Sequence, residues 1–167
     1  MKVFQFDECL NSKRLEAACA AGAKCIPHRF PKRFKGKSVK DPEVLEHFFS
    51  QGKVIVTNDG AMLNDHVDSI PEKHPGLIVV KFSEECHDEL TDDASANILH
   101  TFKSVVPEWP ELHWDNSVLL LTEKSVSVMH KESAHLRTDL HSEYTGHTAH
   151  AVAAILAQNR RRLLTRC

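Results

Sequence analysis

The chain has no long hydrophobic run. Its longest apolar stretches, such as Leu77–Val80 and Val118–Leu121, are far shorter than the roughly 20 residues of a membrane-spanning helix. The charged pair Asp7–Glu8 comes before any apolar segment of signal-peptide length has formed. We therefore expect neither a transmembrane helix nor a secretory signal, and no membrane partner.

The sequence also lacks a disulfide framework. Its five cysteines include no C-x-x-C pair, and an odd number cannot all pair within one chain. Unpaired thiols are typical of reducing compartments, so we expect a cytoplasmic protein. A length of 167 residues with 41% hydrophobic content predicts one ordinary soluble domain, or one domain with a tail.

A strong net charge is absent, because 21 Lys and Arg oppose 23 Asp and Glu. The charges are nonetheless unevenly placed. Residues 17–40 contain seven cations and no acid, whereas residues 84–93 contain six acids and neither Lys nor Arg. The placement of charge, rather than its total, is therefore the better guide to function.

Strands and helices are predicted to alternate along the chain. Asn11 is suited to cap a helix over residues 12–21, and Asp41 followed by Pro42 is a strong helix start. The nearly all-apolar runs at residues 53–57 and 77–82 are typical of strands buried on both faces. Further segments are expected as strands at residues 2–6, 24–26, 117–122 and 126–130, as a helix around residues 98–106, and as a helix or helical turn around residues 62–70. This alternation predicts a three-layer α/β/α fold with a mainly parallel sheet and a hairpin at its end.

Residues 131–167 differ in composition from the rest. Residues 131–147 are polar and rich in histidine, and we interpret them as a flexible linker. Residues 148–165 predict an appended helix with arginines near its C-terminus, which suits the helix dipole. Its expected inward-facing residues are Val152, Ile155, Leu156, Leu163 and Leu164. We therefore expect a domain at residues 1–130, followed by a His-rich linker and a C-terminal helix.

Acidic residues lie where the predicted strands end. Asp7 and Glu8 follow the first strand, Asp59 follows the third, and Asp41 begins the helix that leads into it. Ligands of open α/β sheets bind beyond the carboxyl ends of the strands, and converging carboxylates favour a divalent cation. Oxygen ligands suit Mg²⁺ or Mn²⁺, and such an ion promotes phosphodiester hydrolysis. The pattern therefore predicts a nuclease.

Each of these acids also has a purely structural interpretation. Asp41 is a plausible helix N-cap, Asp59 could cap the helical turn that follows it, and Glu8 could simply be solvated. The conjunction of acids at several strand ends, rather than any single residue, favours the functional interpretation.

Three segments together resemble the PIN-like proteins, small α/β ribonuclease-type domains related to the toxins of bacterial toxin–antitoxin pairs. The segments are VFQFDECLN, KDPEVLEHFFSQGKVIVTNDGAML and PGLIVVKF, and the resemblance covers about residues 1–130. It implies a metal-dependent ribonuclease with Asp7, Asp41 and Asp59 as catalytic residues. It further implies Mg²⁺ or Mn²⁺ as cofactor, with a cognate antitoxin-like protein and a second copy of the chain as partners.

The remaining ligand positions follow from the same resemblance. Glu8 is a neighbour able to bind the metal, and Asn58 and Asn11 are supporting residues. Related chains usually carry another acid at the position that Ala61 occupies here; Asp65, one helical turn later, is the nearest replacement.

A basic stretch immediately precedes Asp41. Its cations neutralise phosphates and its phenylalanines Phe30 and Phe34 can stack on unpaired bases, which predicts a single-stranded RNA partner. The candidate RNA-binding residues are Arg29, Lys32, Arg33, Lys35 and Lys37. The alternative is a solvated loop whose aromatic residues anchor it to the domain.

Two further functions remain open from the sequence. One is a receiver-like phosphoacceptor domain, which needs a lysine at the end of the last parallel strand; Lys81 is a poor match because we expect it inside its strand. The other is a nucleic-acid or protein-binding module that kept the fold and lost the metal.

Overall fold

The computed structural model of the chain describes residues 2–7, 10, 17, 24–26, 41–81 and 92–165. The expected helix at residues 12–21 lies outside the described residues apart from Ala17. The basic stretch before Asp41 and the acidic stretch at residues 84–91 lie outside them as well.

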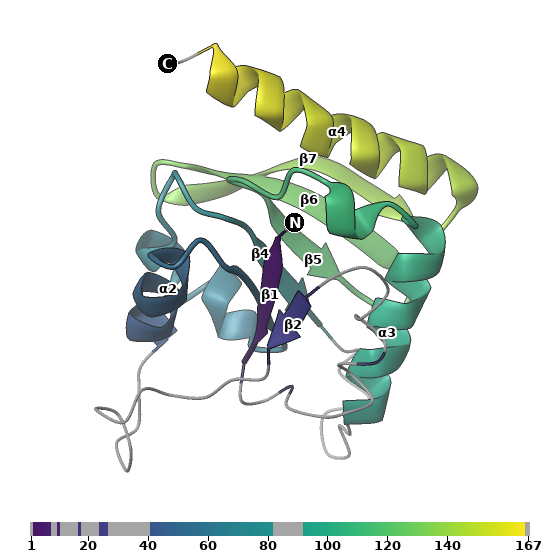
Figure 1. Ribbon diagram of the computed structural model, residues 1–167, viewed down its shortest axis with the longest axis horizontal. Coiled ribbons are helices and arrows are strands. Elements are labelled where there is room, and N and C mark those ends of the chain that lie inside the picture. Colours follow the sequence, from purple (N-terminus) through teal and green to yellow (C-terminus); the bar gives the residue numbers. More distant parts are fainter. Residues whose placement is uncertain are drawn as a thin grey trace.

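Seven strands form one sheet in the order β2-β1-β3-β4-β5-β6-β7. The strands are β1 (Val3–Phe6), β2 (Lys24–Ile26), β3 (Val54–Thr57), β4 (Leu77–Val80), β5 (Val118–Leu121), β6 (Ser125–Glu132) and β7 (His135–Glu143). The first five run parallel to one another, and β6 and β7 extend the sheet by antiparallel pairing (Figure 1). The predicted mainly parallel α/β sheet and its β5–β6 hairpin are confirmed.

Helices cover both faces of the sheet. On one face α3 (Asp92–Val105) and α4 (Gly146–Leu164) pack against the strands, and on the other face α2 (Asp41–Phe49) does so (Figure 1). Short 3-10 helices are η3 (Gly60–Leu63), η4 (Val67–Ser69) and η6 (Trp109–Glu111). The segment around residues 62–70, expected as a helix or helical turn, thus forms two short turns of 3-10 helix.

The central strands are buried because they are apolar on both sides. All four residues of β3 and of β4 are buried, as expected for strands covered by helices on both faces. Alternate side chains enter different clusters: Val54 and Val56 belong to the cluster that includes residues of α3 and α4, whereas Ile55 belongs to the cluster that includes residues of α2. The two central strands therefore follow directly from the runs of apolar residues in the sequence.

The interpretation of residues 131–147 as a flexible linker is wrong. His135–Glu143 forms β7, which pairs along its length with β6, and the expected boundary at residue 130 falls inside β6. The predicted C-terminal helix is confirmed as α4, with Val152 and Leu156 fully buried. Leu164 does not face inward as expected, because it is the last residue of α4 and is 69% exposed.

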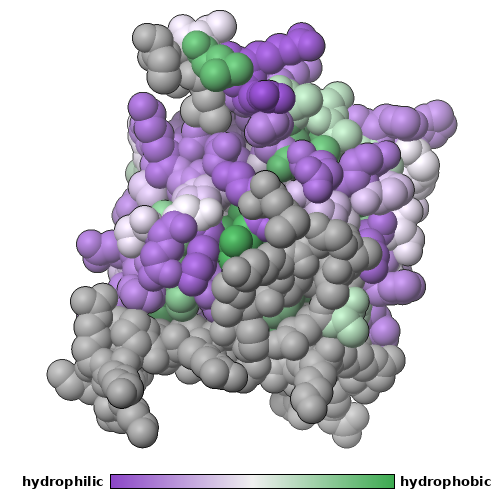
Figure 2. All heavy atoms as spheres, in the orientation of Figure 1, coloured by the Kyte–Doolittle hydropathy of each residue, from purple (hydrophilic) through white to green (hydrophobic). Residues whose placement is uncertain are grey.

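Among the helices that the structure describes, none has the length and hydrophobicity needed to cross a membrane. The surface shown in Figure 2 is largely hydrophilic where its residues are described, with only small, separated hydrophobic areas.

The strand order defines where a ligand site is expected. From β1 the chain crosses to β2 on one side, and β3 then lies on the other side of β1. In doubly wound sheets, ligands bind in the crevice beyond the carboxyl ends of the strands at such a reversal. The carboxyl ends of β1 and β3 are therefore the place to look for chemistry.

Candidate functional site

Asp7 and Thr57 are joined across the carboxyl ends of β1 and β3. The backbone N–H of Asp7 donates to the carbonyl of Val56 at 2.9 Å, which continues the β1–β3 ladder by one residue. This pairing places the Asp7 carboxylate beside the last residue of β3, where the Thr57 hydroxyl donates to Oδ2 at 2.9 Å. Asp7 is 7% exposed and Thr57 is fully buried, so the carboxylate is held in a defined position.

Asp59 is connected to the same hydroxyl. Its backbone N–H donates to Thr57 Oγ1 at 3.0 Å, and its own Oδ1 accepts from the Ala61 N–H at 2.8 Å. Asp59 therefore caps η3, as the structural interpretation expected. Thr57 nevertheless links the chain segments of both acids at the carboxyl ends of β1 and β3.

The other predicted ligands do not join this pair in the part of the chain that the structure describes. Asp65 is exposed in the turn after η3. No three described His, Cys, Asp or Glu side chains are placed to hold one ion together. Asp65, the expected replacement for the acid missing at Ala61, is exposed and forms no such group with Asp7 and Asp59 in the described part of the chain.

Several predicted site residues lie outside the described residues. These are Glu8, Asn11, Arg29, Lys32, Arg33, Lys35 and Lys37. Asp41 begins α2 as predicted, but its side chain is not among those described. Asn58 is partly buried between Thr57 and Asp59.

The sequence led us to expect Lys81 inside its strand, but the structure places it outside. It directly follows β4 and is exposed. The last parallel strand is β5, and Thr122 follows it. The lysine required for a receiver-like domain is therefore not at this position.

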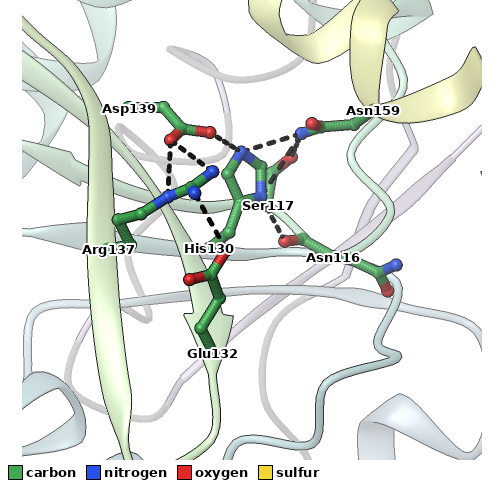
Figure 3. Close-up of polar contacts among 7 residues, drawn as sticks. All are labelled: Asn116, Ser117, His130, Glu132, Arg137, Asp139 and Asn159. Atoms are coloured by element: carbon green, nitrogen blue, oxygen red, sulfur yellow. Dashed lines mark hydrogen bonds and ion pairs between the residues drawn. The ribbon is translucent and has the colours of Figure 1, made fainter. Parts of the chain in front are cut away.

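A second polar cluster lies around β6 and β7, at the other end of the strand order from β2 and β1. It was not predicted from the sequence. His130 on β6 contacts Asp139 on β7 through Nε2, at 2.9 Å from Oδ2. Its Nδ1 lies 2.9 Å from the carbonyl oxygen of Asn116 (Figure 3). The Asn159 amide of α4 lies 2.9 Å from Ser117 Oγ and 3.1 Å from the Nε2 of His130.

A β-bulge creates this cluster. Val128 pairs with Leu140 and Met129 with Thr138, so Asp139 is an extra residue in β7. Such an insertion changes the direction of the side chain, and here the Asp139 carboxylate meets both His130 and the guanidinium of Arg137, 3.0 Å away. The sequence carries little signal for β7, because its only apolar residues, Leu136 and Leu140, pack on opposite faces of the sheet.

Serine, histidine and aspartate are the residue types of acyl-transfer triads, yet this cluster is not arranged for that chemistry. Ser117 is fully buried, and the Asn159 amide nitrogen lies at hydrogen-bond distance from its hydroxyl oxygen. A nucleophile must reach its substrate, so the cluster instead fastens α4 and β7 to the sheet.

His74 lies close to this cluster and is buried. Its Nδ1 accepts from the Gly76 N–H at 3.1 Å, its ring stacks on Phe49, and among the described residues its Nε2 has no hydrogen-bond partner. Burial, followed by the charge of His130, lowers the pKa of His74 to about 4.

We expect the stability of the fold to decrease as pH falls below 6.5, because protonating His74 is costly in the folded state only. The depressed pKa corresponds to a loss of about 2 kcal/mol between pH 7 and pH 5. His74→Asn keeps an acceptor for the Gly76 N–H through an Asx turn and should flatten this dependence, measured by urea unfolding at both pH values. Exposed His150→Asn is the control, and equal pH slopes in His74→Asn and the parent chain would contradict the prediction.

No protein-family model, curated protein or solved structure matches the chain.

Proposed function

We propose that the chain is a metal-dependent nuclease that hydrolyses single-stranded RNA on a PIN-like fold. The observation that carries this proposal is the link from Asp7 through the Thr57 hydroxyl to the Asp59 backbone. It lies at the strand-order reversal, where doubly wound sheets bind their ligands.

The donors present fit a hard divalent cation. Asp7 and Asp59 offer carboxylate oxygens, which suit Mg²⁺ or Mn²⁺, and we assign Glu8 and Asp41 as the further ligands. Bound there, the cation supplies positive charge that stabilises the charge developing on the phosphate oxygens.

The residues of the chain hold this site in place before any substrate binds. The Thr57 hydroxyl fixes the rotamer of Asp7, and the bond from the Ala61 N–H fixes that of Asp59. Because both carboxylates are oriented by these bonds, little reorganisation is needed when the cation and the phosphate arrive.

The remaining partners belong to the same proposal and are supported by sequence alone. The basic stretch with Arg29, Lys32, Arg33, Lys35 and Lys37 would attract RNA towards an acidic site that otherwise repels it. An antitoxin-like protein, a homodimer and a cytoplasmic location are implied by the resemblance and by the cysteine content.

The direct test is cleavage of a labelled single-stranded RNA by the full chain with Mn²⁺ or Mg²⁺, together with calorimetric titration of Mn²⁺. We expect cleavage that EDTA stops and a saturable Mn²⁺ site. Cleavage that persists in EDTA would contradict a metal-dependent mechanism. Absence of both cleavage and Mn²⁺ binding would indicate a binding module that has lost its metal.

Thr57 is expected to act as a positioning residue. Thr57→Val removes the hydroxyl that contacts Asp7 and leaves a buried carboxylate with one hydrogen bond fewer. We expect a loss of roughly 2 kcal/mol in unfolding free energy, a weaker Mn²⁺ affinity and at least about tenfold slower cleavage. Thr57→Ser restores the hydroxyl and should recover both Mn²⁺ affinity and rate; if it recovers stability alone, Thr57 has only a structural role.

A further inference from the structure

The C-terminal turns of α4 expose a cluster of positive charge. Arg160, Arg161 and Arg162 are consecutive and exposed, and residues 146–167 contain no Asp or Glu. None of the three forms a salt bridge with a described carboxylate, in contrast to Arg137, which pairs with Glu132 and Asp139. These three arginines, the α4 arginine cluster, are therefore available to an external anion.

The side of α4 that carries Val152 and Leu156 packs against the sheet. Val152 and Leu156 are buried in the core, and one turn further Asn159 meets Ser117 and His130 beneath the helix (Figure 3). A helix whose apolar face is buried in its own domain cannot insert that face into a lipid bilayer. The packing thus disfavours a membrane and holds the arginines on a fixed support.

The three guanidinium groups cannot converge on one small anion. Consecutive helical residues are separated by about 100° around the helix axis, so their side chains leave the helix in different directions. An array of this kind matches a polymer that carries repeated negative charges. Arginine is well suited to such a partner because its planar donors bind phosphate oxygens in pairs.

The α4 arginine cluster lies away from the acid pair. At the start of α4 Tyr144 bonds to the Thr122 carbonyl, just beyond the carboxyl end of β5, while Asn159 meets Ser117 at its amino end. The helix of 19 residues is roughly 28 Å long. The arginines therefore lie towards the amino edge of the sheet, whereas Asp7 and Asp59 lie at the carboxyl edge.

We infer that the α4 arginine cluster binds backbone phosphates of an RNA strand, outside the stretch that reaches the acid pair. The identity of this polyanion rests on the proposed function, whereas the presence of a phosphate-binding surface rests on charge and exposure. The contact is independent of base sequence, because it involves the backbone alone. It adds affinity for long strands and contributes nothing to the cleavage step itself.

The test measures binding separately from cleavage. Binding of a labelled single-stranded RNA long enough to span the domain is followed by anisotropy in EDTA at several salt concentrations. The variant R160Q/R161Q/R162Q is expected to bind at least tenfold more weakly. The slope of log K against log salt should become shallower by about 2, which is three phosphate contacts at ~0.7 each.

Two matched variants serve as controls. K73Q/K103Q/K124Q removes the same charge from scattered positions and should change the slope by less than about 1. R160K/R161K/R162K keeps the charge and should retain most of the salt dependence. Because the three arginines are exposed, thermal unfolding of the glutamine variant should match that of the parent chain.

Unchanged affinity and slope in R160Q/R161Q/R162Q would overturn the inference. An equal loss of RNA affinity in K73Q/K103Q/K124Q would overturn it as well. If R160Q/R161Q/R162Q lost binding to anionic phospholipid vesicles and kept the RNA binding of the parent chain, the inference would be overturned in favour of a membrane partner. If RNA binds with the expected slopes and no cleavage occurs with Mn²⁺, the nuclease proposal fails and the arginine contact stands.

Discussion

Asp7→Asn and Asp59→Asn are each expected to abolish metal-dependent cleavage of single-stranded RNA. Asparagine has the shape of aspartate but lacks its charge, so either change removes a proposed anionic ligand of the cation. Even changes to residues behind a metal ligand cost 10–100-fold, and we therefore expect more than about 100-fold loss for a ligand itself. The amide oxygen can still accept from Thr57 or Ala61, which should preserve the local bonds.

The measurement is the initial rate of cleavage with Mn²⁺, accompanied by the urea midpoint of each variant. Asp65→Asn is the matched control, since Asp65 follows η3 on the same segment and is exposed. We expect this variant to keep parental activity. Full activity in both Asp7→Asn and Asp59→Asn, with folding intact, would refute the assignment of the site.

Gly76→Ala is expected to cause the largest loss of stability among substitutions of the described glycines. Gly76 has φ +133°, and an added Cβ would lie 2.8 Å from the Cβ and 2.9 Å from the carbonyl oxygen of Trp114. Trp114 is fully buried and its backbone cannot yield easily. Backbone strain and overpacking together predict a loss of roughly 2–5 kcal/mol in unfolding free energy.

Substitutions at two other glycines separate the effect of backbone strain from that of overpacking. Gly52 has φ +69° with nothing near its Cβ position, so Gly52→Ala tests strain alone and should cost about 1 kcal/mol. Gly146 has neither feature, and Gly146→Ala should be nearly neutral. Urea unfolding of the three variants provides the comparison, and equal losses at Gly76 and Gly52 would show that the contact with Trp114 is relieved.

The sequence predicted the central sheet well because its signals are local. Apolar runs such as residues 53–57 are long enough to identify a buried strand, and Asp41–Pro42 identifies the start of α2. The convergence of Asp7 and Asp59 needed only one further rule, that parallel strands present their carboxyl ends at one edge. The buried strand and the start of α2 are confirmed, whereas the convergence of the two carboxylates and the metal stay predictions.

The features that the sequence failed to predict depend on strand pairing at the edge of the sheet and on local backbone geometry. β7 is an edge strand whose polar residues face solvent, so it has no apolar run to distinguish it from a linker. The contact between His130 and Asp139 requires a bulge, and no residue spacing reveals where an extra residue is accommodated. The direction of Asp65 likewise depends on the 3-10 geometry of η3, which differs from that of an α-helix.

The bond between Thr57 and Asp7 joins residues 50 positions apart in the chain, which has a kinetic consequence. Long-range pairing must overcome the entropy of closing a long loop, and contacts of this kind limit folding rates. The β6–β7 hairpin closes over a few residues and can form early. On the proposed function, a newly synthesised or partly unfolded copy would therefore be inactive, and RNA would be exposed only to chains whose β1 and β3 have already paired.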